Sequence, residues 1–184
     1  CSTGHITVNG KDGKPGTSVK VGDVLGIRFG EKYSEYEILS IAEHAAKLGV
    51  NVVVENMRVI HTFVASHRYA QTPDELCDIA DALGIGCCWD FGHANISGIK
   101  QSEGLSYVGK RLRVLHINDN FGIGDDHVPP FVGNIDWKDA MHGLHEMGFD
   151  GLLNFEIATG RIPNELRHAH AKYLVGAAEI LESY

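Results

Sequence analysis

Four short apolar runs divide this chain at intervals, and segments with a helical pattern of apolar residues separate them. The runs are VNVVV at 50–54, IGCCW at 85–89, RVL at 113–115 and LLNF at 152–155. Short, β-branched or apolar runs of this kind are typical of strands buried on both faces of a parallel sheet. A fifth run, HITVN at 5–9, alternates weakly and is also predicted to be a strand.

Helical patterns fill the intervals between the apolar runs. One helix is expected from about Tyr33 to a stop at Gly49, and another after Thr72, where Pro73 and Glu75 complete a capping-box pattern. Further helices are predicted over 102–111 and 137–147 and from Pro163 toward Tyr184. Five strands alternating with helices predict an α/β fold with a parallel sheet, as a single domain over residues 1–184.

Composition narrows the class of protein without naming an activity. The 184 residues are 43% hydrophobic and 22% charged, which is ordinary for a globular chain, and the net charge of −8 makes nucleic acid an unlikely partner. The sequence contains no apolar run long enough to span a membrane and no recognisable secretory signal. The cysteines lack metal-ligand spacing and are interpreted as small apolar residues of a reducing, cytoplasmic protein: Cys1, Cys77, Cys87 and Cys88.

A metal-binding type of residue follows each of the four central apolar runs. These residues are Glu55, Asp90, His116 and Glu156. The carboxyl ends of parallel strands meet on one face of a barrel, and the two-residue period of a strand allows all four side chains to point inward there. Three carboxylates so close together would repel one another unless a cation neutralised them. The leading hypothesis is a divalent-metal centre with an enzyme around it, and the oxygen-rich set suits Mn²⁺, Mg²⁺ or Co²⁺, with Zn²⁺ possible.

Additional polar residues lie near this set in the sequence. Each one alone is a weak signal, because polar groups are common in loops at strand ends. A D-x-H pair in the loop after 113–117 offers a possible additional metal or substrate site, and two other polar residues stand close to the expected ligands. The candidates are His93, Asn118, Asp125 and His127.

Five motifs occur in an order that resembles the xylose isomerase-like barrel superfamily, which includes sugar isomerases and epimerases and endonuclease IV. They are VVVENM, WDFGHAN, VLHINDN, DDHVPPFVGNIDW and LLNFEI, and the resemblance spans residues 34–184. It implies a parallel (β/α) barrel of TIM type that is partial, with about five of eight strand–helix units. It also implies that Glu55, Asp90, His116 and Glu156 bind one divalent ion.

The resemblance implies a reaction as well as a fold. In sugar isomerases and epimerases of this type the two glutamates, here Glu55 and Glu156, flank the substrate carbon and move a proton on and off it beside a carbonyl. His93 would contact the substrate, with Asn118 as a further substrate-binding candidate. A sugar or sugar-like keto compound is therefore the expected small-molecule substrate. The sequence departs from the sugar epimerases after His116, where NDNFGIG contains no arginine.

Two alternatives to the isomerase remain open at the level of sequence. One is a zinc phosphodiesterase similar to endonuclease IV, in which His93, Asp125 and His127 bind further ions. The other is a truncated barrel that binds a ligand without turnover. Because three strand–helix units are not found, either a second copy of the chain or a missing N-terminal portion is expected to complete the barrel.

Overall fold

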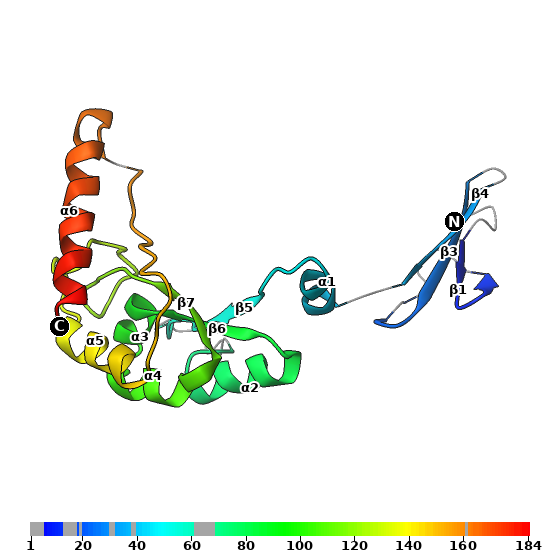
Figure 1. Cartoon of the computed structure of the whole chain (residues 1–184), viewed down its shortest axis with the longest axis horizontal. Helices are drawn as coiled ribbons and strands as arrows, with labels where there is room; N and C mark the ends of the chain where they lie inside the picture. The colour runs from blue at the N-terminus through cyan, green and yellow to red at the C-terminus, as the bar shows by residue number, and fades with distance from the viewer. Residues whose placement is uncertain are drawn as a thin grey trace. The chain divides into compact units, whose positions relative to one another are not determined.

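The chain forms two compact units in a computed structural model, which describes residues 6–12, 18, 20–29, 32–37, 40–60, 69–160 and 162–184. Unit 1 spans Cys1–Val52 and unit 2 spans Val53–Tyr184, whereas the sequence predicted one domain over 1–184. Figure 1 labels the elements along the chain, and each unit is described by itself. Among the described residues, no helix combines the length and apolar character needed to cross a bilayer.

Unit 1 contains a four-stranded antiparallel sheet in the order β2-β1-β3-β4. The strands are β1 (Ile6–Val8), β2 (Lys11–Asp12), β3 (Val24–Phe29) and β4 (Lys32–Glu37), and helix α1 (Ile41–Lys47) follows them. Asn9 and Gly10 join β1 to β2 with φ angles of 52° and 75°, the left-handed conformations that a tight hairpin requires. All strands of this sheet come from unit 1, and the sheet shares no strand with the parallel sheet of unit 2.

Two predictions for this part of the chain are wrong. The run at 5–9 does form a strand at Ile6–Val8, but it pairs antiparallel with β2 and β3 and does not belong to the parallel sheet. The helix expected from Tyr33 begins only at Ile41, because residues 32–37 pair with β3 in a continuous register. A capping box between Ser40 and Glu43 marks the true start of the helix.

Unit 2 is built on a parallel sheet in the order β5-β6-β7. Its strands are β5 (Val53–Glu55), β6 (Gly86–Asp90) and β7 (Leu112–His116), and their register pairs Glu55 with Cys88 and Asp90 with His116. The predicted strand at 151–157 is reduced to a single parallel bridge between Phe155 and Ile117. The partial barrel is confirmed, and the described residues of unit 2 contain four strand positions in place of the five expected.

Helices alternate with these strands and cover the sheet. They are α2 (Pro73–Leu83), α3 (Phe91–Ile96), α4 (Gln101–Val108) with a short 3-10 turn at Gly109–Arg111, α5 (Trp137–Glu146) and α6 (Asn164–Glu182). Helices α2, α4 and α5 follow one another along one side of the sheet (Figure 1). Thr72 precedes α2 without a side-chain cap, so the expected capping box does not form, and Glu75 Oε2 accepts a hydrogen bond from the Gln71 amide at 3.1 Å.

The core of unit 2 lies between the sheet and these helices. Its largest buried side chains include Trp89, Phe91, Leu105 and Leu115. Trp89 Nε1 donates to Gln101 Oε1 at 2.9 Å, so the indole is buried without an unpaired donor. Burial raises the pKa of the Cys87 thiol to about 12, which keeps it protonated and apolar, as the sequence interpretation required.

A single buried carboxylate organises the loop between β7 and α5. Asp119 is fully buried, and its Oδ1 accepts from the amides of Asn120 (2.9 Å) and Ile135 (3.2 Å). Its Oδ2 accepts from the Phe131 amide (3.1 Å) and from Trp137 Nε1 (2.9 Å). The same loop contains Asp125 and His127. By fixing the backbone of the loop, Asp119 helps to position these two candidate site residues.

We expect Asp119→Ala to lower the free energy of unfolding of unit 2 by about 3 kcal/mol or more, because several buried donors lose their acceptor together. Urea unfolding followed by tryptophan fluorescence measures this, since both tryptophans lie in unit 2. Asp136→Ala is the matched control: Asp136 is an exposed helix cap on Asp139, and its loss is expected to cost only about 1 kcal/mol. Equal effects of the two variants would contradict the organising role.

Candidate metal centre

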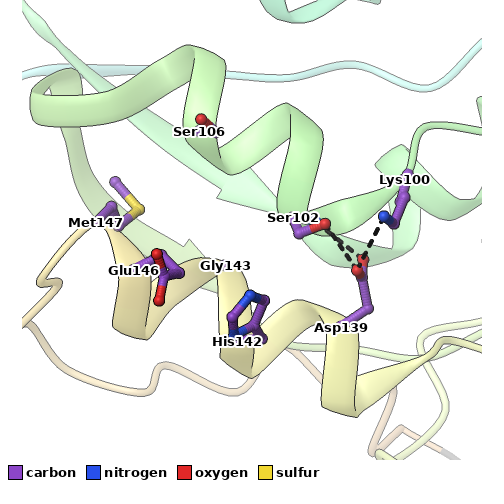
Figure 2. A pocket seen from close by; sticks show the side chains of 8 residues that line it. All are labelled: Lys100, Ser102, Ser106, Asp139, His142, Gly143, Glu146 and Met147. Carbon is purple, nitrogen blue, oxygen red and sulfur yellow. Dashed lines mark hydrogen bonds and ion pairs between the residues drawn. The ribbon is translucent and has the colours of Figure 1, made fainter.

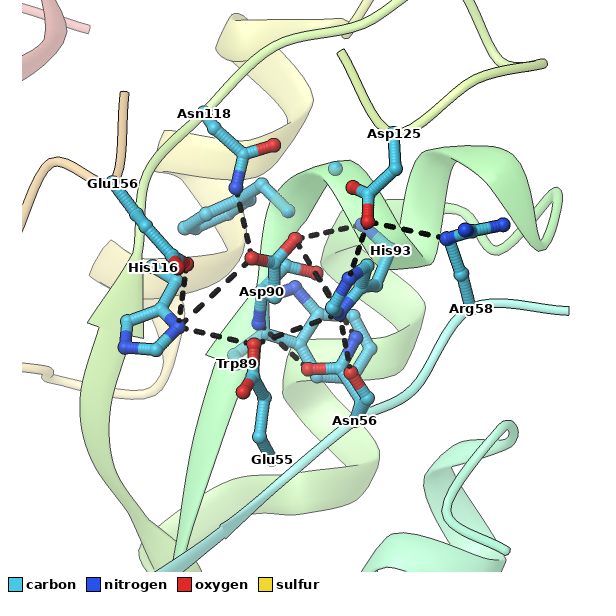
Figure 3. Close-up of polar contacts among 12 residues, drawn as sticks. Glu55, Asn56, Arg58, Trp89, Asp90, His93, His116, Asn118, Asp125 and Glu156 are labelled. Atoms are coloured by element: carbon cyan, nitrogen blue, oxygen red, sulfur yellow. Dashed lines mark hydrogen bonds and ion pairs between the residues drawn. The ribbon is translucent and has the colours of Figure 1, made fainter. Parts of the chain in front are cut away.

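The four predicted ligands converge at the carboxyl end of the parallel sheet. Glu55, Asp90 and His116 are the last residues of β5, β6 and β7, and Glu156 follows the bridge residue Phe155. Each residue offers one ligand atom, and these atoms all lie within 4.8 Å of one another. Figure 3 shows the four side chains pointing toward a common centre.

His116 stands in the middle of this group. Its Nδ1 lies 2.9 Å from Glu156 Oε2, 3.0 Å from Glu55 Oε1 and 4.0 Å from Asp90 Oδ2. A ring N–H can donate to only one of these oxygens well, whereas a divalent ion bound by the imidazole nitrogen would attract all three carboxylates. The donor set therefore fits a divalent ion better than it fits a hydrogen-bond network.

Asp90 is the most buried member of the set and is held by two hydrogen bonds. Its Oδ1 accepts from the His93 amide at 2.7 Å, and its Oδ2 accepts from Asn118 Nδ2 at 2.8 Å. Burial, with a smaller contribution from the Glu55 charge, raises the pKa of Asp90 even though both hydrogen bonds and His93 act in the opposite sense. A buried carboxylate of this kind gains most from a cation, because a cation restores the charge balance that solvent would otherwise supply.

Asn118 was expected to contact the substrate, and the structure gives its side chain another partner. Asn118 is fully buried, and its Nδ2 is used on Asp90, so it orients a candidate ligand. Its Oδ1 has no hydrogen-bond partner among the described residues and lies against Gly92, where a Cβ would come within 2.0 Å of it. Gly92 is therefore required for the close approach of Asn118 to Asp90.

Asn56 is a structural residue of the site that the sequence analysis missed. Its amide accepts from the Asp90 amide through Oδ1 at 2.6 Å and donates from Nδ2 to the Asp90 carbonyl at 2.9 Å. The side chain thus occupies both backbone groups of Asp90 just beyond the end of β5. The sequence did contain one sign of this role, because Asn56 is a polar residue close to the end of an apolar run. The adjacent Glu55 was interpreted as the functional residue of this strand end instead.

A second cluster lies beside the first and contains His93, Asp125 and His127, with ligand atoms again within 4.8 Å of one another. His93 Nδ1 is 2.8 Å from the Asn56 carbonyl, and His127 Nδ1 is 2.9 Å from the Glu156 carbonyl. A carbonyl only accepts, so each Nδ1 carries a proton, and in the neutral form of each ring Nε2 offers the lone pair that could bind an ion. These Nε2 atoms lie 3.4 Å and 3.2 Å from the Asp125 carboxylate.

The contact between His127 and Asp125 is close but is not a hydrogen bond. Asp125 Oδ1 is buried without a hydrogen-bond partner, although His127 Nε2 lies 3.2 Å away. Burial lowers the pKa of His127, but the hydrogen bond to the Glu156 carbonyl and the nearby charge of Asp125 outweigh it and raise the pKa above its ordinary value. Asp125 Oδ2 instead accepts from Arg58 Nε at 3.1 Å, a partner that the sequence analysis also missed.

A separate groove between α4 and α5 contains no residue of either cluster. Figure 2 shows it lined by Lys100, Ser102, Asp139 and His142, among others. Asp139 accepts from Ser102 Oγ at 2.7 Å and lies 3.6 Å from Lys100 Nζ. The main polar groups of this groove are thus paired with one another, and the groove lies on the helical side of unit 2, away from the strand ends.

The sequence and structure of this chain are similar to those of sugar-converting proteins. An inosose isomerase of Bacillus velezensis is 30% identical over 142 residues, which cover 68% of this chain and 46% of that protein. A solved D-tagatose 3-epimerase-like protein is 26% identical, with a TM-score of 0.60 over 78% of this chain and 52% of that one. The chain thus spans about half, or less, of the length of these relatives.

A relative of another kind matches a shorter stretch with higher identity. An RQC P-site tRNA stabilizing factor of Listeria monocytogenes is 52% identical over 44 residues, which are 24% of this chain and 48% of that protein. The length of this match is close to that of unit 1, Cys1–Val52. The sequence profile of a family described as xylose isomerase-like TIM barrels matches residues 37–177, which include every residue of both clusters. The chain therefore belongs to the xylose isomerase-like TIM barrel family.

Proposed function

We propose that unit 2 forms the metal-binding part of a divalent-metal-dependent sugar isomerase or epimerase. The observation that carries the proposal is the placement of Glu55 and Glu156 on either side of His116 Nδ1, at 3.0 and 2.9 Å. The reaction class is supported by two similar proteins, an inosose isomerase and a D-tagatose 3-epimerase-like protein, whose names describe an isomerase and an epimerase. Since the chain covers about half of each relative, the activity of the whole protein is part of the proposal.

The proposed chemistry divides the four residues into two tasks. Asp90 and His116 would bind the ion together with the two glutamates. Asn56 and Asn118 orient Asp90 through hydrogen bonds to its backbone and to its carboxylate. When bound, the ion would stabilise the negative charge that develops on the substrate oxygens as a neighbouring C–H bond breaks. Glu55 and Glu156 come from different strand ends, so one carboxylate could remove a proton from one face of the carbon while the other, in its protonated form, donates a proton to the opposite face.

The substrate would meet the site from the side that remains open to solvent. Glu156 is the most exposed of the four ligands, with 46% of its side chain accessible, whereas the side chain of Asp90 is fully buried. Glu156 is therefore better placed to exchange protons with substrate and solvent, and Asp90 is better placed as a permanent ligand. His93 stays our candidate for a substrate contact because it links both clusters.

The experiment is an assay of hydrogen exchange with the full chain in D₂O. A panel of ketoses and keto-inositols is incubated with the protein and Mn²⁺, Mg²⁺, Co²⁺ or Zn²⁺, and deuterium at the carbon beside the carbonyl is followed by NMR. We expect exchange that stops when EDTA removes the ion. Metal-dependent cleavage of abasic DNA without exchange on any sugar would instead favour the phosphodiesterase, and binding of no ion would favour a barrel without turnover.

A second candidate function concerns unit 1. We infer that the similarity to the tRNA stabilizing factor lies there, because the match has nearly the length of the unit and the family profile takes residues 37–177. Lys11 and Lys20 are both exposed. Asp23 links the segments that carry them, because its carboxylate accepts hydrogen bonds from Asn9 Nδ2 and from the Lys20 amide, each at 2.9 Å. RNA is the candidate ligand.

Binding of a fluorescent tRNA by the full chain tests this candidate. We expect salt-sensitive binding that weakens several-fold when Lys11 and Lys20 are both changed to Glu, because each phosphate contact releases counterions. Lys110→Glu on unit 2 serves as the control with a single charge reversal elsewhere. Binding that neither salt nor the double change alters would contradict the role.

A further inference from the structure

The two clusters of unit 2 differ in their charge balance. The first contains three carboxylates and one imidazole, so it is strongly negative until a cation binds. The second contains one carboxylate and two imidazoles, and the guanidinium of Arg58 already lies against that carboxylate. The second cluster is thus neutral without any metal ion when its imidazoles are neutral.

Arg58 shares an oxygen atom with the ligand set of the second cluster. Its Nε donates to Asp125 Oδ2 at 3.1 Å, and the same oxygen lies 3.4 Å from His93 Nε2. In Figure 3 the guanidinium approaches Asp125 on the side away from the first cluster. An ion bound between Asp125 and His93 would therefore have a fixed positive charge as a near neighbour.

The position of Arg58 is set by the backbone around it. Its carbonyl accepts from the buried Gln71 side chain at 3.1 Å, and the amide of the next residue, Val59, donates to Ser97 Oγ at 3.0 Å. These contacts anchor the segment after β5 to α3 and to the residues before α2. The side chain is only about a third exposed, at 32%, so its charge is not free to turn away into solvent without losing the ion pair.

We propose that Arg58 prevents the second cluster from binding a metal ion tightly and so keeps the centre mononuclear. An arginine is suited to this role because its guanidinium stays protonated in proteins and cannot discharge when a cation approaches. Two positive charges a few ångströms apart repel strongly where solvent is partly excluded. The inference rests on the proposed function for the identity of the first site, but the role of Arg58 concerns the second site alone.

The number of ions would decide the class of reaction. One ion that holds neighbouring oxygens suits proton transfer beside a carbonyl, whereas two or more ions clamp the attacking and leaving oxygens of phosphate hydrolysis. Arg58 would then be a specificity-determining residue: it leaves the Glu55–Asp90–His116–Glu156 site for one ion and reduces His93, Asp125 and His127 to substrate contacts.

Metal stoichiometry of the full chain tests the proposal without reference to activity. The protein is stripped with a chelator and titrated with CoCl₂, and bound cobalt is counted by elemental analysis and followed by visible absorption. Arg58→Met removes the charge and keeps an unbranched side chain. We expect the variant to bind one ion more than the wild type, with at least tenfold tighter binding at the additional site.

Two further variants locate the effect. Arg58→Met combined with His127→Gln should return to the wild-type number of ions, since it removes a ligand of the additional site. Arg111→Met removes a similar charge from an exposed pair, in which Arg111 Nη2 lies 2.7 Å from Asp81 Oδ2, and should leave the number unchanged. Circular dichroism of each variant confirms that the fold is kept.

Each possible number of bound ions either supports or contradicts the proposed role of Arg58. An additional ion in Arg58→Met that His127→Gln removes supports the role of Arg58, even if the wild type binds none and the proposed isomerase site fails. The same number of ions in Arg58→Met and in the wild type, or two ions already in the wild type, would overturn it. An additional ion in Arg111→Met as well would show a general effect of net charge and would also overturn it.

Discussion

Glu156→Gln is expected to lose proton exchange by about 10²–10⁴-fold while the protein still binds its ion. Glutamine keeps the shape of the side chain and one ligand oxygen, but it cannot accept a proton from carbon. Glu156 Oε2 lies 2.9 Å from His116 Nδ1, so a neutral oxygen in this place can still contribute to a metal site around His116. The expected separation of binding from turnover distinguishes a base from a residue that only holds the ion.

Deuterium incorporation at the carbon beside the carbonyl measures this loss, and cobalt titration measures the bound ion. Glu146→Gln is the matched control, because Glu146 is an exposed glutamate of α5 that lines the groove in Figure 2. It should keep full exchange. Full exchange in Glu156→Gln would exclude the side chain as the base and would leave Glu55 as the candidate.

The convergence of the four ligands could be predicted because it depends on a simple property of parallel sheets. Glu55, Asp90 and His116 each end a strand, and the register that pairs Asp90 with His116 brings their side chains to one level. Glu156 was predicted by the same reasoning, although its strand is reduced to a bridge at Phe155. The position of a residue at the end of an apolar run was therefore enough to predict the convergence, even where that run does not form a full strand.

The supporting residues could not be predicted in the same way. Asn56 and Arg58 lie just beyond β5 in a segment without regular structure, where neither period nor spacing says which way a side chain points. Asn118 was predicted as a substrate contact because it follows β7, but the close approach allowed by Gly92 turns its amide toward Asp90. Such contacts depend on atoms from three different segments and are visible only once the fold is known.

Unit 1 shows where a pattern of apolar residues misled. The helical pattern that continues to Gly49 predicts a helix from about Tyr33, whereas six cross-strand pairs with β3 make residues 32–37 a strand. The run at 5–9 was assigned to the parallel sheet because it was the first strand in an alternating order. Pairing partners decide both cases, and a local pattern does not contain them.

The second of the largest expected effects is that Asp90→Asn will abolish tight metal binding without destabilising the metal-free protein. Loss of a charged ligand should weaken the first site by about a hundredfold or more, since even the loss of an outer partner weakens metal sites by 10- to 100-fold. The folded protein, however, no longer buries a carboxylate whose pKa is raised by burial. If the Asn118 side chain turns over, its unpaired Oδ1 can accept from the new amide, which replaces the hydrogen bond that Asn118 Nδ2 donates to Asp90 in the wild type.

Urea unfolding with and without the ion measures both parts of this prediction. Without the ion, the free energy of unfolding of the variant should lie within about 1 kcal/mol of the wild-type value or above it. At an ion concentration 100 times the wild-type dissociation constant, the wild type should gain about 2.7 kcal/mol and a variant with a hundredfold weaker site only about 0.4 kcal/mol. A large loss of stability in the absence of the ion would make Asp90 a structural residue, and an undiminished gain with the ion would remove it from the metal site.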